Sequence, residues 1–355
     1  MTVVLQVAYP LSPVGPDAVG GAEQVLFHLE RALAARGVST VTVASEDSQI
    51  SGTLVPVPRG RPPYDTEAIS AARQRHSEAI RAALARWPIS LVHMHGFDFD
   101  QYLPPPGIPV LATLHCPTSW YAPEALNPRS SDLWLNAVSR YQLQGLAQNG
   151  KLIGVVENGV PVDLFASHPK RRGFALVLAR IAPEKGIREA LEAAHLAEFP
   201  MLIAGELFPY PQHQRYFEQA IFPLLDQKRR WLGPIGFTRK RRLLAHARCV
   251  VIPSLESETS SLVLREAFAA GTPVVAFRRG ALADAIENGR TGFLVESVEG
   301  IADAMKKIAA LDGNACRAVA QKDFSLERMV DGYLDLYRKV IRLSGSTRAR
   351  LKLTS

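Results

Sequence analysis

The chain has 355 residues, of which 47% are hydrophobic, 21% charged and 8% aromatic, and its formal net charge at pH 7 is +7. This length and composition favour two globular domains, and because no apolar run approaches the roughly 18 residues of a membrane span, we expect no transmembrane helix. The three cysteines are odd in number and far apart, which argues against a disulfide framework or a cysteine metal site and favours the cytoplasm as the compartment.

The charges are distributed unevenly between the two halves of the chain. Residues 1–165 carry 11 Lys and Arg against 14 Asp and Glu, whereas residues 166–355 carry 30 against 20. A basic half suits an anionic ligand, a membrane surface or nucleic acid. We expect the basic runs 228–230 and 239–242 to be solvated faces and expect no nucleic-acid partner. A peripheral contact with a membrane or glycolipid, at the inner face of the membrane, stays open as the alternative.

Short β-branched runs alternate with amphipathic segments along the whole chain, which predicts parallel sheets of the α/β class. In chain order, the first half is expected to hold strands at 3–8, 38–44, 91–95, 110–115, 134–139 and 153–157, and helices at 21–36 and 66–86. The second half is expected to hold strands at 175–180, 200–204, 230–232, 249–252, 274–277 and 292–295, and helices at 184–197, 239–247, 261–270 and 301–311.

A polar seam at 163–173, with Pro169 and the basic run 170–172, separates the two sets of elements. We therefore expect one Rossmann-like domain at 1–165 and a second at 166–325. A last helix is expected at 325–343, so that segment 326–355 comprises this helix and a frayed basic tail.

The first element with chemical content begins at residue 19, where Gly20 and Gly21 follow the first strand and open a helix. A backbone without side chains at a helix start lets a phosphate approach closely, although an ordinary turn explains a lone Gly-Gly equally well. Further along, Asp98 and Asp100 have the Asp-x-Asp spacing of some metal-dependent enzymes, but they lie in an N-terminal loop and we expect no metal there. His93 and His95 share one face of a strand and are interpreted as polar strand-end residues.

Two cations follow the first strand of the second domain. Arg180 ends that strand and Lys185 begins the next helix, so both are expected to converge on one point. Fixed cations of this kind can hold a diphosphate and take up charge on a leaving group. The alternative is an ordinary loop with surface charges.

Two glutamates then flank a strand-loop-helix segment. The strand at 249–252 is followed by a Pro-Ser loop, Glu258 precedes a helix that opens near Ser260, and Glu266 lies two turns inside that helix. Eight helical residues separate such groups by roughly 12 Å, beyond the roughly 5–9.5 Å of a glycosidase carboxylate pair. This spacing suits an elongated polyhydroxylated ligand, unless Glu258 only caps the helix and Glu266 is solvated.

These segments, with the Gly-x-Pro-Val-Val run at 271–275, resemble retaining glycosyltransferase family four, which has the GT-B fold. The resemblance implies that Glu266 holds the nucleotide ribose and Glu258 the donor sugar, and that Arg180 and Lys185 stabilise the leaving phosphate. It also implies that His115 reaches the donor sugar. The family often has Gly-aromatic-Gly where this chain has Thr259, Ser260 and Ser261, so these three are expected to contact the sugar differently.

The resemblance further implies two Rossmann-like domains that face a central cleft, with the last helix crossing back to the N-terminal domain. The N-terminal domain would bind a saccharide, glycolipid or small-molecule acceptor, and the C-terminal domain a nucleoside-diphosphate sugar. Transfer would retain the anomeric configuration without a metal or other cofactor. A nucleotide-sugar epimerase and a non-catalytic nucleotide-sugar binding protein remain as alternatives, while the lack of Gly-x-Gly-x-x-Gly disfavours an NAD-dependent oxidoreductase.

Overall fold

The computed structural model describes residues 2–60, 62, 64–146, 150–165 and 173–353, without the side chains of 346–353. The chain divides into two compact units, Met1–Asn158 with Leu326–Ser355, and Gly159–Ser325. The boundary therefore lies seven residues before the expected one, because Val162 and Phe165 are buried in the core of the second unit and the Val160 amide donates to the Phe324 carbonyl at 2.9 Å. The expected basic run 170–172 lies outside the described residues.

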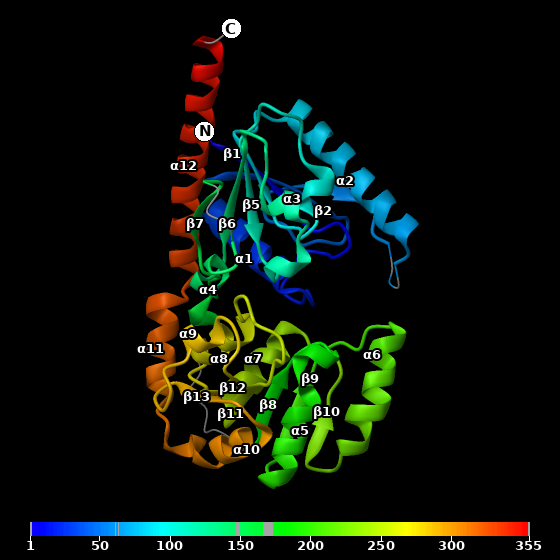
Figure 1. The fold of residues 1–355 in the computed structure, drawn as a ribbon, viewed down its shortest axis with the longest axis vertical. Coiled ribbons are helices and arrows are strands. Elements are labelled where there is room, and N and C mark those ends of the chain that lie inside the picture. Colours follow the sequence, from blue (N-terminus) through cyan, green and yellow to red (C-terminus); the bar gives the residue numbers. More distant parts are fainter. Residues whose placement is uncertain (1, 61, 63, 147–149, 166–172, 354–355) are drawn as a thin grey trace. The chain divides into compact units, whose positions relative to one another are not determined.

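The first unit contains a seven-stranded parallel sheet in the order β3-β2-β1-β4-β5-β6-β7 (Figure 1). Its central strands are almost wholly buried, as expected for a parallel sheet covered on both faces. The strands are β1 Val3–Val7, β2 Ser39–Ser45, β3 Thr53–Val57, β4 Leu91–Met94, β5 Val110–Leu114, β6 Leu133–Ala137 and β7 Leu152–Val155.

Strand β3 is absent from the sequence prediction, because Pro56 interrupts its apolar run. Proline cannot donate to a sheet ladder and is tolerated at an edge strand, and β3 is the edge of this sheet. The helices of the first unit are α1 Gly21–Ala35, α2 Thr66–Arg86, α3 Pro123–Leu126, α4 Arg140–Leu143 and α12 Leu326–Leu353.

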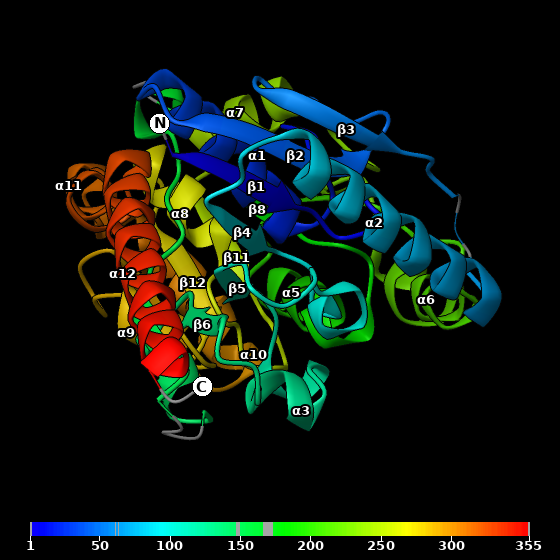
Figure 2. The same ribbon diagram turned by 90° about the horizontal axis from the view of Figure 1, so that it is seen from above.

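Helix α12 follows the second unit in the chain but belongs to the first unit, as the resemblance implies (Figures 1 and 2). It packs against α1 and β5, and the Lys339 Nζ donates to the Ile153 carbonyl of β7 at 2.7 Å. The helix continues to Leu353, ten residues beyond the end at 343 that the sequence predicts. Six residues of the segment 344–353 are Ala, Arg, Lys or Leu, which favour helix, against Gly345 and three Ser or Thr residues.

The second unit contains a six-stranded parallel sheet in the order β10-β9-β8-β11-β12-β13. The strands are β8 Ala175–Leu178, β9 Met201–Ala204, β10 Arg229–Trp231, β11 Cys249–Ile252, β12 Val274–Phe277 and β13 Gly292–Val295. The helices are α5 Ile187–Leu196, α6 Pro211–Tyr216, α7 Phe237–His246, α8 Leu262–Ala269, α9 Leu282–Ala285, α10 Val298–Lys307 and α11 Gly313–Asp323.

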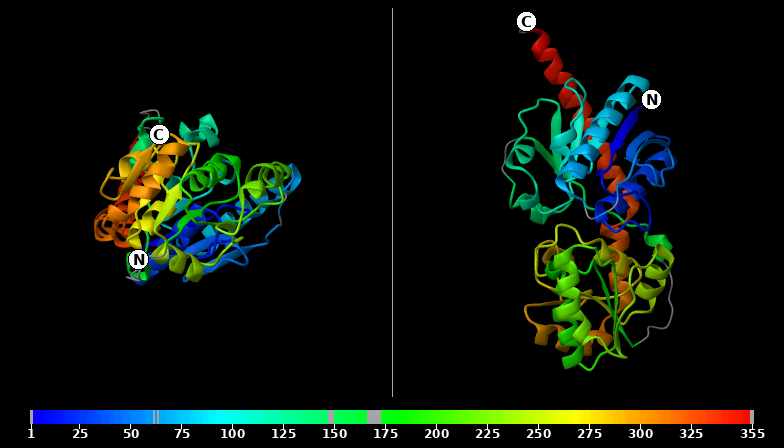
Figure 3. Two further views of the ribbon diagram at one scale, coloured as in Figure 1. Left: turned by 90° about the horizontal axis from the view of Figure 1, so that it is seen from below. Right: turned by 90° about the vertical axis from the view of Figure 1, so that its right-hand side faces the viewer.

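Alternating strand residues divide the core of the second unit into two layers. Leu176 and Val250 face one layer with α7, α8 and α11, and their neighbours Val177 and Val251 face the other with α5 and α10. Further views of the ribbon show the helices that cover this sheet (Figure 3). Helices on both faces leave the loops at the carboxyl edge of the sheet to carry the functional residues. In the part of the chain that the structure describes, no helix is both long and apolar enough to cross a membrane.

Candidate functional site

The loops that follow β8 and β11 are joined at the carboxyl edge of the second sheet. The Leu255 amide donates to the Glu184 carbonyl at 2.9 Å. Gly186 has a φ of +63°, and a Cβ there would overlap the Pro253 carbonyl oxygen. Only glycine adopts that conformation and permits that approach without strain. The two predicted segments, one with Arg180 and Lys185 and one with Glu258, therefore form one structure.

An ion pair connects the two loops. The Lys185 Nζ lies 2.7 Å from Glu258 Oε1, which also accepts a hydrogen bond from Ser254 Oγ at 2.6 Å. Burial opposes the ionisation of Glu258, but attraction to Lys185, the hydrogen bonds from Lys185 and Ser254, and the nearby Arg180 outweigh it. The pKa of Glu258 consequently lies below its usual value, and this carboxylate is ionised at neutral pH.

Arg180 stands beside this pair. Its Nη2 lies 3.5 Å from Glu184 Oε1, and both side chains are about one-third exposed or less. A pair at that distance and exposure holds the guanidinium weakly. The remaining donors of the guanidinium fork stay available for an anionic ligand beside Lys185.

A third loop holds Glu258 from the other side. The Ala281 amide donates to the Glu258 carbonyl at 2.8 Å, and Glu258 and Gly280 form a parallel bridge. Gly280 has a φ of +57°, and a Cβ there would overlap the Glu258 backbone. The loop after β12 thus requires glycine in order to place the Glu258 backbone.

Glu266 lies on α8, and the structure gives it a partner that the sequence analysis missed. The Lys240 Nζ of α7 lies 2.6 Å from Glu266 Oε1, and the two side chains are only 13% and 5% exposed. The expected solvated face at 239–242 is therefore wrong at Lys240. Lys240 precedes the buried Leu244 by four residues, so helical periodicity already indicated that both share a face.

The three polar residues between the glutamates have different environments. Ser261 caps α8, because its Oγ accepts from the Leu264 amide at 3.3 Å, and Ser260 is also buried. Thr259 is more exposed. The Ser261 hydroxyl thus serves the helix, and the contacts expected with a sugar fall to Thr259, Ser260 and the backbone.

Gly20 and Gly21 lie in the first unit, where Gly20 is the N-cap of α1 and Gly21 its first residue. A Cβ on Gly20 would overlap the Glu23 carboxylate, which folds back over this helix start. A carboxylate here is favoured by the positive end of the helix dipole. A phosphate that used these amides would have to displace Glu23.

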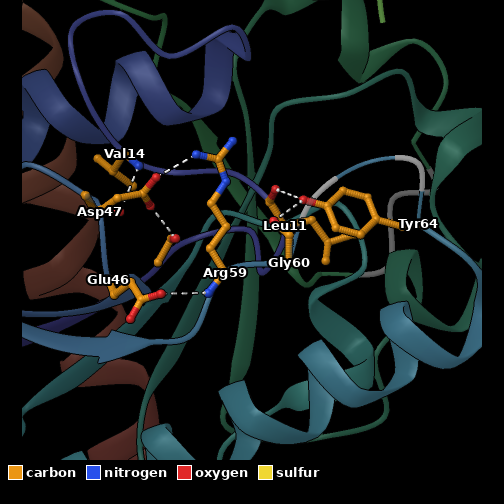
Figure 4. Close-up of polar contacts among 9 residues, drawn as sticks. Leu11, Val14, Glu46, Asp47, Arg59, Gly60 and Tyr64 are labelled. Carbon is orange, nitrogen blue, oxygen red and sulfur yellow. Dashed lines mark hydrogen bonds and ion pairs between the residues drawn. The ribbon is translucent and has the colours of Figure 1, made fainter. Parts of the chain in front are cut away.

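The loop that leads to these glycines is held by polar contacts with the loops after β2 and β3 (Figure 4). The Val14 amide donates to Ser48 Oγ at 3.0 Å, and the Tyr64 hydroxyl donates to the carbonyl of Leu11 at 3.1 Å. Arg59 pairs with Asp47 at 2.6 Å in the same cluster.

His115 follows β5 in the first unit, and its Nε2 lies 3.1 Å from the Nδ1 of His95. Burial lowers the pKa of His115 to about 3, so its ring is neutral at physiological pH. His93 and His95 are buried and hydrogen-bonded within the same network. Among the described residues, no group of three or more His, Cys, Asp or Glu could hold a metal ion.

Asp98 of the Asp-x-Asp sequence is occupied by structural partners. The Arg73 Nε lies 2.7 Å from one carboxylate oxygen and the Tyr102 hydroxyl donates to the other at 2.9 Å. Of the predicted residues, the structure thus brings together Arg180, Lys185 and Glu258 in the second unit. His115, Gly20 and Gly21 belong to the first.

Models of known protein families match both halves of the chain. A model described as "Glycosyl transferases group 1" matches residues 173–310, and one described as "Glycosyltransferase Family 4" matches residues 19–164. The chain is 26% identical over 344 residues to the phosphatidyl-myo-inositol mannosyltransferase of Mycobacterium leprae, covering 86% of this chain and 88% of that protein.

Solved structures share the fold. The sucrose-phosphate synthase of Thermosynechococcus elongatus superposes with a TM-score of 0.76 at 20% identity, covering 96% of this chain and 100% of that one. Anabaena HepE in complex with UDP-glucose superposes with a TM-score of 0.70 at 17% identity, covering 96% of this chain and 100% of that one.

Proposed function

The chain belongs to the group 1 glycosyltransferases of family 4, with the GT-B fold, and from this premise we propose a retaining, metal-independent transfer to an acceptor hydroxyl. The protein is a glycosyltransferase that uses a sugar-nucleotide donor. The single observation that carries the proposal is the cluster in which Lys185, Ser254 and Arg180 surround the Glu258 carboxylate.

In this proposal, the second unit binds the donor. Arg180 and Lys185 hold the diphosphate, and because charge on the leaving phosphate rises as the glycosidic bond breaks, fixed cations stabilise the transition state more than the ground state. Glu258 accepts hydrogen bonds from donor-sugar hydroxyls, as do Thr259 and Ser260. Glu266, with its buried partner Lys240, accepts from the ribose hydroxyls.

Retention follows from displacement on one face of the sugar. The bond from the anomeric carbon to the phosphate oxygen breaks, the acceptor oxygen bonds to the same face, and the leaving phosphate takes the acceptor proton. Two protein cations supply the positive charge that a metal ion would supply in other transferases. No protein base is then needed, which agrees with the lowered pKa of His115.

The first unit would bind the acceptor. Of its residues, His115 would contact the donor sugar, and the amides at Gly20 and Gly21 would contact a phosphate of the donor. The acceptor class we propose is a saccharide, glycolipid or small molecule. One relative is named for a phosphatidyl-inositol acceptor and one structural neighbour for a sugar-phosphate product. A membrane contact of the basic second unit would accompany a lipid acceptor.

The test begins with thermal shifts against UDP-, GDP-, ADP- and dTDP-sugars. A donor at a hundredfold excess over its Kd should stabilise the protein by about 2.7 kcal/mol. Incubation of that donor with an acceptor in the presence of EDTA should then release free nucleoside diphosphate. NMR of the glycosylated product should show the same anomeric configuration as in the donor. Isomerised donor without acceptor would indicate an epimerase, and binding without turnover a binding protein. Activity lost in EDTA and restored by Mn²⁺ would contradict the metal-free mechanism.

Steady-state kinetics then test the cations. Arg180→Ala and Lys185→Ala should each lower kcat by about 10²–10³-fold, the usual loss for a preorganised charge stabiliser. Arg188→Ala is the matched control, since Arg188 is exposed on α5 and pairs with Glu192. If both site variants keep kcat within about threefold of the control, the donor site is misplaced.

A further inference from the structure

A continuous hydrogen-bonded network runs through the core of the first unit and ends at His115. We call it the histidine network. It joins β1, β4, β5, β6 and α12, and all its members are buried except His115, which is partly buried. Its members are Gln6, His93, His95, Thr113, His115, Asn136 and Tyr337.

The direction of each hydrogen bond can be worked out from one fixed end. The Ala137 carbonyl can only accept, so the Asn136 Nδ2 faces it at 3.3 Å and Oδ1 faces Thr113. Asn136 Oδ1 can only accept in turn, so it takes the single hydroxyl proton of Thr113 at 2.7 Å. Thr113 Oγ1 therefore accepts from His93 Nε2, 2.7 Å away.

The same reasoning continues through Tyr337. A neutral imidazole carries one N–H, so His93 Nδ1 must accept from the Tyr337 hydroxyl at 2.8 Å. Burial raises the pKa of Tyr337 well above its usual value, so the hydroxyl keeps that proton. With its only proton donated, the Tyr337 oxygen accepts from the Gln6 amide nitrogen at 3.1 Å.

The orientation of the Gln6 amide fixes the donors and acceptors of the two remaining histidines. Because its amide nitrogen faces Tyr337, its Oε1 faces His95 Nε2 at 2.8 Å, and that nitrogen must carry the proton. His95 Nδ1 then accepts from His115 Nε2 at 3.1 Å. Burial lowers the pKa of all three histidines, which keeps each ring neutral and the directions fixed at neutral pH.

We infer that the histidine network holds His115 as the Nε2-protonated tautomer, with Gln6, His95 and Tyr337 as positioning residues. Resting on the proposed function, this assigns the ring atom through which His115 would meet the substrate: with the proton on Nε2 and shared with His95, Nδ1 is the acceptor of the ring, and a substrate hydroxyl would donate to it. His115 orients that hydroxyl and does not take its proton. A general base requires a pKa near the working pH, which His115 lacks.

The first test uses the folded, ligand-free protein and needs no activity. Two-bond ¹H–¹⁵N correlation spectra of protein labelled with ¹⁵N-histidine distinguish the tautomers, and loss of one signal in His115→Gln gives the assignment. We expect His115 to be protonated on Nε2 with an unprotonated Nδ1 at pH 7. A His115 protonated on Nδ1 would overturn the inference, whether or not the protein transfers sugar.

The second test breaks the network at Tyr337. In Tyr337→Phe, Gln6 loses the hydroxyl that orients its amide, so His95 and His115 should populate both tautomers. We expect a second His115 signal protonated on Nδ1, and kcat lowered in proportion to its population, with KM for the donor unchanged within about twofold. Tyr333→Phe is the control, since the Tyr333 hydroxyl contacts Thr113 at 3.3 Å and also Asn136, but none of the hydrogen bonds that lead from Tyr337 to His115 passes through it.

The outcomes separate this inference from the proposed function. If kcat of Tyr337→Phe falls while the His115 tautomer stays the same, Tyr337 affects catalysis through the structure of the unit and not through the tautomer of His115. That result would overturn the positioning role. If Tyr337→Phe fails to fold, the spectrum of the wild-type protein still decides the tautomer. The expected tautomer in a protein that never turns over a nucleotide sugar would refute the proposed function alone.

Discussion

Replacement of Lys185 by Met removes one partner of a partly buried ion pair. The pair joins Lys185 and Glu258 at 2.7 Å, with side chains 26% and 17% exposed. Loss of one partner costs about 3–5 kcal/mol in a fully buried pair, whereas an exposed pair contributes about 0.2–1 kcal/mol. Since this pair lies between those limits, we expect Lys185→Met to lower the free energy of unfolding by about 1–3 kcal/mol at pH 7.

The loss should depend on pH, because Lys185 helps to hold the pKa of Glu258 below its usual value of 4.5. A carboxyl group with a lowered pKa stabilises the folded state above its unfolded pKa and loses that contribution as pH falls through its folded pKa. The difference between wild type and Lys185→Met should therefore be full at pH 7 and shrink as pH falls below about 4.5.

Urea denaturation at pH 7 and near pH 4 measures both quantities. Arg188→Met is the matched control, because Arg188 pairs with Glu192 at 2.8 Å on the exposed surface of the same unit. It should cost under about 0.5 kcal/mol. If Lys185→Met destabilises no more than this control, or loses the same amount at both pH values, the pairing with Glu258 is not what stabilises this loop.

Three further predictions test other parts of the structure. Lys240→Met leaves Glu266 buried without its cation, so urea denaturation should show a loss of about 3 kcal/mol; a loss under about 1 kcal/mol would contradict the pairing. Gly280→Ala should destabilise by at least about 1 kcal/mol more than Gly289→Ala, since both have positive φ but only Gly280 meets the Glu258 backbone; equal losses would refute the steric argument. The three histidines of the histidine network have lowered pKa values, so the unfolded chain binds protons below pH 6.5 that the folded chain does not bind. Stability should be full above pH 6.5 and fall below it by up to about 1.4 kcal/mol per pH unit for each histidine, and a flat denaturation profile from pH 7 to 5 would exclude this.

The alternation of apolar strands and amphipathic helices was sufficient to predict both sheets, because burial on two faces leaves a continuous apolar run in the sequence. Strand β3 was not predicted because Pro56, which an edge strand tolerates, interrupts that apolar pattern.

The last ten residues of α12 were not predicted as helix because they lack an apolar pattern. A basic polar tail with good helix formers can extend a packed helix without any apolar signal of its own.

The site could be predicted in part, because parallel strands place the residues after their carboxyl ends along one edge. Arg180, Lys185 and Glu258 follow β8 and β11, which are neighbours in the sheet. Their mutual pairing depends on Gly186 and on the loop at Pro253, and no pattern in the sequence gives that geometry.

The histidine network could not be predicted from the sequence. Tyr337 lies 331 residues from Gln6, and their contact depends on where α12 docks on the first sheet. Helical periodicity identifies Tyr337 as a buried position but cannot identify its partners. The direction of the hydrogen bonds then follows from residues on four strands and on α12. The sequence singled out His93 and His95 as polar strand-end residues and, by resemblance, His115, but not the residues that connect them.

Replacements of Lys185 and Arg180, the two proposed phosphate-binding residues, should differ in their effect on the free energy of unfolding. Lys185 already neutralises Glu258 before a donor binds, whereas Arg180 has only a weak pair with Glu184 at 3.5 Å. A carboxylate accepts about four hydrogen bonds and Glu258 Oε1 takes two, so a sugar hydroxyl can join the cluster without breaking it. A diphosphate instead competes with Glu258 for Lys185. Lys185→Met should therefore lower both stability and kcat, while Arg180→Met should lower kcat by a similar factor and leave the unfolding free energy within about 0.5 kcal/mol.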